Sequence, residues 1–205
     1  MAKYNKREAL KIIIAAALEY DEKLKNKHFL IVYQNKKVIK VAKIGFRDMN
    51  FMHMTGVTTK LSAQQFYKAC LEGKLSQQDF EIDNMGKVQQ KLLVLPYLSE
   101  LLYHNCMIGD FINNGIYIKA DYFVGNTKAI LSVGFRAGKE VDFPVTLYKE
   151  DVRKITKPTN KILAIFVKMY NEKQYNRCTY LSDGQELSGL IEKEEIKDLV
   201  NIELL

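Results

Sequence analysis

The stretch FMHMTGV, from Phe51 to Val57, places one of only three histidines two residues before a threonine and three before a glycine. Imidazole titrates near neutral pH, so His53 suits either proton-transfer role in a hydrolytic reaction. The hydroxyl of Thr55 can hold a phosphoryl oxygen. The alternative interpretation is a packed corner in which Thr55 merely precedes a turn at Gly56. The residues themselves leave both interpretations open.

Metal-free RNA cleavage needs a base for the 2′-hydroxyl proton, an acid for the leaving oxygen, and cations around the phosphate. Several side chains elsewhere in the chain have the required chemistry, although each is equally typical of a solvated surface or a packed strand. The candidate cations and hydroxyls are Lys60, Ser62, Lys91, Lys119, Arg136 and Thr146. Ser62 and Gln65 form a capping box pattern, and the start of a helix favours an anion such as phosphate.

Metal and cofactor chemistry is not indicated by the motifs. The chain has no H-E-x-x-H, H-x-H or paired aspartate motif, and neither a dinucleotide fingerprint nor a P-loop. Cys70, Cys106 and Cys178 are odd in number and form no C-x-x-C pair, which disfavours a disulfide framework or a zinc ribbon. We therefore expect no metal, no cofactor and reduced thiols.

The composition is that of a globular protein, and its basic charge is compatible with an anionic partner, although many basic proteins bind no nucleic acid. Hydrophobic residues make up 47% of the 205 positions, and the formal net charge is +7. A basic balance favours association with phosphate groups, so nucleic acid is the expected partner class. The longest apolar run, Ile12 to Leu18, is far shorter than the ~20 residues that span a bilayer, and no signal peptide is recognised. We expect a cytoplasmic location and no membrane partner, and the oligomeric state stays unknown.

The elements that must position these groups fall into two classes. Apolar residues at helical spacing predict a helix over 5–25, and a capping box at Ser62 predicts another that ends at Gly73. A third helix, over 87–104, should be broken at Pro96. The stretch 51–61 is expected to be the entrance to the helix that begins at Ser62.

Strand patterns surround these helices. Residues 28–46 predict a hairpin with its turn at 35–37, and a tail from Asp183 carries a charged helix candidate. Segments rich in β-branched and aromatic residues predict an antiparallel meander, with Lys119 on one of its strands; these segments are 107–112, 115–124, 129–135 and 141–148. Residues 161–170 fit either another strand or a short helix. The fold class is therefore α+β.

Several short motifs occur in a recognisable order. They are F-M-H-M-T-G-V, L-S-A-Q-Q-F-Y-K-A-C, K-L-L-V-L-P, M-I-G-D-F and I-Y-I-K-A-D. This succession resembles the phage and mobile-element family of Barnase–EndoU–colicin–RelE-like nucleases, over roughly Phe46 to Tyr170. The resemblance implies helices packed on an antiparallel sheet of about four strands, and metal-independent cleavage of RNA.

The resemblance also assigns residues and segments. His53 and Thr55 match the H-x-T-G motif, Lys91 the helix lysine and Lys119 the basic residue of the strand, which makes these four the expected catalytic group. Lys60, Ser62, Arg136 and Thr146 are the expected RNA contacts. Residues 46–170 then form the nuclease domain, residues 1–45 an N-terminal helix–hairpin extension, and residues 171–205 a C-terminal helical tail.

Two other functions compete with the ribonuclease. One is a counter-defence protein of a mobile element that binds or alters the guide RNA of a CRISPR effector ribonucleoprotein. The other is a non-catalytic interaction protein in which His53 is buried and the lysines keep the surface soluble. Convergence of His53, Thr55, Lys91 and Lys119 on one concave surface would favour catalysis.

Overall fold

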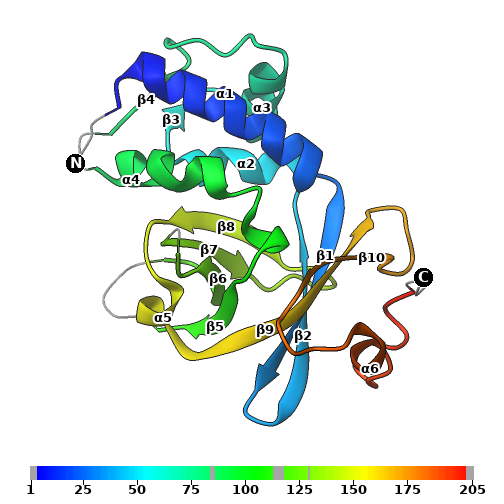
Figure 1. The fold of residues 1–205 in the computed structure, drawn as a ribbon. Coiled ribbons are helices and arrows are strands. Elements are labelled where there is room, and N and C mark those ends of the chain that lie inside the picture. Colours follow the sequence, from blue (N-terminus) through cyan, green and yellow to red (C-terminus); the bar gives the residue numbers. More distant parts are fainter. Residues whose placement is uncertain (1–3, 84–85, 113–117, 129, 202–205) are drawn as a thin grey trace.

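The computed structural model describes residues 4–83, 86–112, 118–128 and 130–201. Its fold is α+β, as expected, with four of its helices gathered on one side of a large antiparallel sheet and the short helix α5 (Val152–Ile155) just before β9 (Thr156–Met169) (Figure 1). The helices on this side are α1 (Lys6–Lys23), α2 (Asp48–Thr55), α3 (Ala63–Leu71) and α4 (Lys87–Val94), followed by the 3-10 helices η1 (Leu95–Tyr97) and η2 (Leu101–Tyr103).

Local sequence signals explain where three of these helices begin or end. Asn5 caps α1 and Ser62 caps α3, each through a capping box that pairs the cap with the residue three positions later. Pro96 lies in the first turn of η1, where its missing N–H has no cost, so the helix over 87–104 is broken as predicted. None of the described helices is long and apolar enough to cross a membrane.

The sheet contains eight strands among the described residues, and the expectation of about four is wrong. Its order is β2-β1-β9-β5-β6-β7-β8, with β10 paired to β9. The bounds are β1 (Lys27–Asn35), β2 (Val38–Gly45), β5 (Met107–Phe111), β6 (Tyr122–Asn126), β7 (Leu131–Arg136), β8 (Phe143–Tyr148), β9 (Thr156–Met169) and β10 (Arg177–Leu181). A separate pair, β3 (Thr58–Thr59) and β4 (Phe80–Glu81), lies beside the helices.

The long strand β9 is the reason the sheet exceeds four strands. Its second half pairs with β1 on one edge and β10 on the other, while its first half pairs with β5. Both segments that were expected to be extensions, 1–45 and 171–205, therefore add strands to the same sheet. A separate role for either segment stays a prediction.

The two ends of the strand order meet each other. Asp142, just before β8, forms a bridge with Ile44 of β2. The N–H of Gly45 donates to the carbonyl of Asp142 at 2.9 Å, and the N–H of Asp142 donates to the carbonyl of Lys43 at 2.8 Å. The sheet is thus curled so that β2 and the start of β8 are hydrogen-bonded neighbours, although they are far apart in the strand order.

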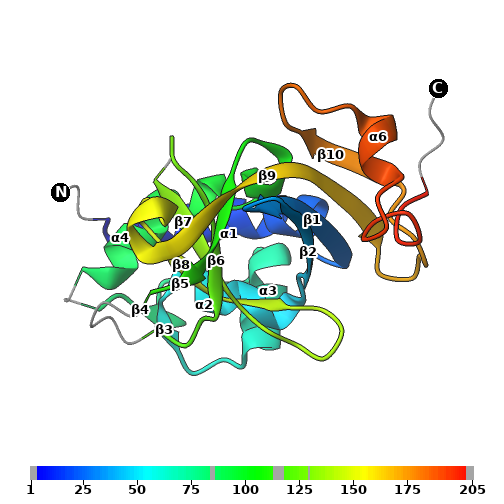
Figure 2. The ribbon, with the colours of Figure 1, turned by 90° about the horizontal axis from the view of Figure 1, so that it is seen from below.

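The core lies on both faces of the β1–β9 region. One face packs against α1 to α4 through the main cluster, which includes Phe29, Phe51 and Phe135. The other face is covered by the chain after β10, which contains α6 (Leu187–Ile191) and buries Leu190 and Ile196 against Leu30 and Phe166. Figures 1 and 2 show α6 next to β10, away from α1 to α4. Within residues 171–201 the tail is therefore helical only over α6, and it also contributes strand β10, which pairs with β9.

Candidate active site

The corner that holds His53 is the end of a helix rather than the loop before one. Residues Asp48–Thr55 form α2, and Gly56 caps it in the left-handed conformation with φ +75°. The start of α2 is held on two sides: the hydroxyl of Tyr20 in α1 donates to the carbonyl of Arg47, and the amide of Asn50 donates to the carbonyl of Pro144. His53 lies exposed in the last turn. The expectation of a loop at His53 is wrong.

Thr55 faces the interior of this corner. It is 0% exposed, its hydroxyl donates to the carbonyl of Met52 at 2.8 Å, and it accepts from the N–H of Val57 at 3.3 Å. These two bonds fix the turn after α2. The structure therefore does not bring the Thr55 hydroxyl to the surface that His53 occupies.

Lys91 crosses the same corner from α4. Its ammonium donates to the backbone carbonyl of His53 at 2.9 Å, where the end of α2 leaves carbonyl groups that favour a cation. Burial lowers the pKa of Lys91 to about 8. A Cβ at Gly56 would lie 2.7 Å from Cδ of Lys91, so the glycine is needed both for its φ and for the path of the lysine.

His53 opens onto a pocket of about 960 Å³, called the basic pocket below, between α2, the start of β1 and the connection from β7 to β8. Lys119 and Arg136 line this pocket too, so three of the expected site residues converge. The charged residues that line it are Lys25, Arg47, Asp48, Lys119, Arg136, Lys139, Glu140 and Asp142. Cations therefore outnumber carboxylates, and only Lys25 among these cations forms an ion pair within the described chain, with Asp21 at 2.8 Å.

The position of Lys119 differs from the expectation. It lies in irregular chain before β6, which begins at Tyr122, and so the expectation of a strand at Lys119 is wrong. The ladder between β6 and β7 begins only at Tyr122, and Ala120 lies over Gly134, where a Cβ would be 2.9 Å from its methyl group. The residues just before this segment, 113–117, lie outside the described part of the chain.

His28 also lines the basic pocket, although no sequence pattern indicated it as a site residue. His28, near the start of β1, packs edge-on against Tyr170 with ring centroids 5.1 Å apart. Its ring also lies over Gly45, where a Cβ would be 2.9 Å from Cδ2. The pKa of His28 is lowered, first by burial and then by the charges of Lys168 and Arg47. His28 is therefore neutral at pH 7, in the form that accepts a proton.

The basic pocket also has an apolar rim. Met49, Phe143 and Tyr170 line it, and all three are exposed large hydrophobic side chains. Exposed aromatic rings beside cations are the combination on which proteins stack the bases of single-stranded nucleic acids. Together these side chains can hold a phosphate and the base next to it.

Three of the expected RNA contacts, Lys60, Ser62 and Thr146, lie outside the basic pocket. Lys60 is exposed in the chain before α3, and Ser62 uses its hydroxyl to accept from the N–H of Gln65 at 3.3 Å. Thr146 is half-buried in β8. None of these three lines the basic pocket, and their role as RNA contacts stays a prediction. Within the described residues, no three His, Cys, Asp or Glu side chains are grouped to hold a metal ion.

Comparison with known protein families identifies a nuclease family. The family model described as phage-Barnase-EndoU-ColicinE5/D-RelE like nuclease 4 matches residues 12–184. The matched range includes the β1–β2 hairpin and β10, which the resemblance left outside. No curated protein and no solved structure matches the chain.

Proposed function

Because the chain belongs to the phage-Barnase-EndoU-ColicinE5/D-RelE like nuclease 4 family, we propose that it is a metal-independent endoribonuclease whose active site is the basic pocket. The observation that carries the proposal is the grouping of His28 and His53 with Arg47, Lys119 and Arg136 in one pocket. Two imidazoles supply a base and an acid, and three cations supply the charge that a phosphate needs.

The two histidines take different roles in the proposed step. His28, neutral because of its lowered pKa, accepts the proton of the 2′-hydroxyl as the 2′-oxygen attacks phosphorus. The bond from phosphorus to the 5′-oxygen breaks, and His53 donates a proton to that leaving oxygen. The products are a 2′,3′-cyclic phosphate and a free 5′-hydroxyl.

The cations act on the phosphate. Arg136, Arg47 and Lys119 hold the non-bridging oxygens, where negative charge increases in the transition state. Lys91 lies behind the corner and contacts the backbone of His53, so it is a positioning residue rather than a phosphate ligand. Its contact fixes the end of α2 and with it the direction of the imidazole.

The substrate of this site is unpaired RNA. Only an unpaired base presents its face to Tyr170 or Phe143 while its phosphate contacts the cations. The 2′-hydroxyl is the nucleophile, which DNA lacks.

The test uses all three histidines of the chain. Purified protein is incubated with single-stranded RNA in the presence of EDTA, and we expect fragments that end in a cyclic phosphate. His53→Ala and His28→Ala should each lower the rate by roughly 100- to 10,000-fold, the range for a positioned acid or base. His104→Ala is the matched control, because His104 is exposed, pairs with Glu100 and lies outside the basic pocket.

Three results would contradict the proposal. Cleavage that requires a divalent metal would refute the mechanism, and equal losses in all three histidine variants would refute the site. RNA binding that survives His53→Ala in a protein that never cleaves would favour the binding alternative over catalysis.

A further inference from the structure

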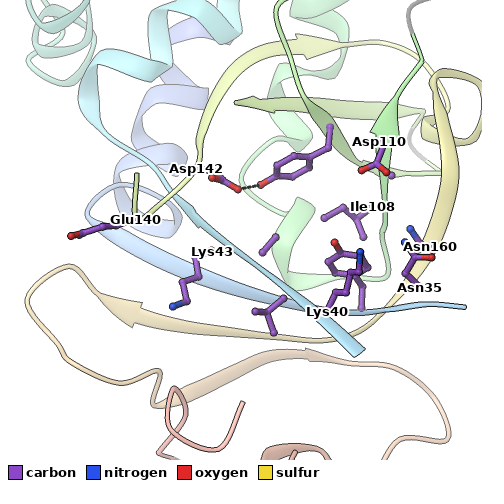
Figure 3. A pocket seen from close by; sticks show the side chains of 13 residues that line it. Asn35, Lys40, Lys43, Ile108, Asp110, Glu140, Asp142 and Asn160 are labelled. Atoms are coloured by element: carbon purple, nitrogen blue, oxygen red, sulfur yellow. Dashed lines mark hydrogen bonds between the residues drawn. The ribbon is translucent and has the colours of Figure 1, made fainter. Parts of the chain in front are cut away.

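A second pocket, of about 330 Å³, lies on the other side of the 140–142 segment and is called the polar pocket below. It is lined by the end of the β1–β2 hairpin, by β5 and β6, and by the first half of β9. Figure 3 shows how its side chains converge from these strands. Its polar side chains are Tyr33, Asn35, Lys40, Lys43, Asp110, Tyr122, Glu140, Asp142 and Asn160.

Asn160 is the observation that points to a ligand. It is only 9% exposed, it lines the polar pocket from β9, and its side-chain amide forms no hydrogen bond within the described chain. Other buried amides of the fold are paired: that of Gln89 donates to the carbonyl of Tyr4 at 3.0 Å and accepts from its N–H at 2.7 Å. The amide of Asn160 borders the open pocket, so a ligand there can reach it. A ligand that offers both a donor and an acceptor would pair with its oxygen and its N–H groups.

Hydrogen-bonding capacity is distributed unevenly around the polar pocket. The carboxylate of Asp142 is already used, since it accepts from the hydroxyl of Tyr122 at 2.8 Å and from the N–H of Gly138 at 3.0 Å. Asp110 and Tyr33 form no side-chain hydrogen bond within the described residues. Burial and the nearby carboxylates of Asp110 and Asp142 raise the pKa of Tyr33, so its hydroxyl stays protonated. The pocket therefore offers an unused carboxylate, an unused amide and an unused hydroxyl.

The two pockets adjoin. Glu140 and Asp142 line both of them, so a nucleotide that places its phosphate among the cations has the polar pocket beside it. Lys40 and Lys43 of β2 also line the polar pocket and add positive charge to it (Figure 3).

We propose that the polar pocket binds a purine base of the RNA whose phosphate lies in the basic pocket. The proposal rests on the ribonuclease function and adds its base preference. Purines present donors and acceptors on adjacent atoms: an asparagine amide pairs with N6 and N7 of adenine, while a carboxylate accepts from the N1–H and N2 amino group of guanine. Asn160 and Asp110 supply these two groups, and the ring of Tyr33 or Tyr122 provides an aromatic wall.

Calorimetric titration tests the polar pocket without requiring cleavage. The probes are the 3′-monophosphates of guanosine, adenosine, cytidine and uridine, with inorganic phosphate as the probe for the basic pocket alone. We expect at least one purine nucleotide to bind about 10-fold more tightly than both pyrimidine nucleotides, which is within the discrimination that one good bidentate contact gives. Purine affinity equal to that of pyrimidines or of phosphate would overturn the proposal.

Two variants tie the preference to the residues. Asn160→Leu keeps the volume and removes the amide, and should reduce purine affinity to the level of the pyrimidines without changing phosphate affinity. Asp110→Asn, at an exposed position, should lower guanosine affinity more than adenosine affinity. Asn201→Leu is the control, because Asn201 is exposed and lines neither pocket. A purine preference that survives both pocket variants would place the base elsewhere.

Sequencing the fragment ends separates this inference from the ribonuclease proposal. If His53→Ala abolishes cleavage but the cut sites show no purine preference, the purine pocket fails while the nuclease stands. If purine binding depends on Asn160 but no cleavage occurs in EDTA, the pocket stands and the nuclease mechanism fails.

Discussion

Two features of Gly56 disfavour a side chain there: its positive φ and its contact with Lys91. The cost of each in unfolding free energy can be measured separately. The φ of +75° at Gly56 disfavours any L side chain, by roughly 1–2 kcal/mol. Its contact with Lys91 adds a second cost, because a methyl group there displaces the lysine from the carbonyl of His53. Gly184 has nearly the same φ, +79°, and nothing within 4 Å of a built Cβ. It is therefore a matched control for the first cost alone.

We predict that Gly56→Ala destabilises the protein more than Gly184→Ala does, by about 1 kcal/mol, the size of one ordinary hydrogen bond. Urea unfolding measures the loss of unfolding free energy in both variants. In a Lys91→Ala background the cost of Gly56→Ala should fall to that of Gly184→Ala. If the two glycine variants cost the same with Lys91 present, Lys91 moves aside freely and does not position His53.

The lowered pKa of His28 predicts a pH dependence. A general base works only when deprotonated, so kcat/KM should rise with pH through the pKa of His28, which lies below the ordinary value of about 6.5. Lys168→Met removes one of the charges that lower this pKa, so the rising limb should move to higher pH. The profile is measured with one RNA at constant ionic strength.

Lys154→Met is the control for the previous experiment, because Lys154 is exposed and pairs with Glu150 outside both pockets. A rising limb that stays in place when Lys168 is replaced, or that moves equally in both variants, would exclude His28 as the base.

The candidate site was only partly predictable from the sequence. His53, Lys119 and Arg136 were recognised from their chemistry and do converge, whereas His28 has no local signal at all. It becomes part of the site because strand pairing brings its ring over Gly45 and against Tyr170, within the electrostatic influence of Arg47. Thr55 shows the converse: its motif is recognisable, but its hydroxyl is used within the corner.

At the scale of elements, the helices and hairpin followed local patterns while the extent of the sheet did not. The capping box at Ser62, the break at Pro96 and the turn between β1 and β2 are each specified by neighbouring residues. Helix α2 was not predicted, because it is only eight residues long and starts after Arg47, which is not a preferred cap residue. Strand β10 was not predicted either, because its five residues are stabilised by pairing with β9 and not by a local sequence signal.

The segment around α6 should be part of the cooperative fold. Ile196 is 0% exposed and packs in the cluster that covers β1 and β9. Ile196→Ala should therefore destabilise the protein by roughly 2–5 kcal/mol, the usual cost of such a truncation in a core. Thermal unfolding should remain a single transition at lower temperature. Glu194→Ala, at an exposed neighbour, is the control. An unchanged main transition in Ile196→Ala would show that the tail unfolds independently.

At the scale of the whole molecule, the formal charge of +7 should draw RNA to the protein, but only the pocket cations should be neutralised on binding. For single strands the logarithm of the binding constant falls with the logarithm of salt concentration by ~0.7 per phosphate contact. Arg136→Ala should reduce this slope by about 0.7, as one contact is lost. Lys193→Ala lowers the net charge equally from an exposed site outside both pockets, and should leave the slope unchanged. Equal slopes in both variants would indicate binding by overall charge alone.

The hydrogen bonds between β2 and Asp142 should limit aggregation of the protein at high concentration. A strand at the end of a sheet exposes backbone groups that another chain can pair with, which is a common route to aggregation. Here the backbone of Lys43 and Gly45 is already bonded to Asp142, so the last residues of β2 cannot add a foreign strand. The charges of Lys40 and Lys43 oppose such an approach along the rest of the strand. The segment that separates the two pockets thus also protects the sheet against edge-to-edge association.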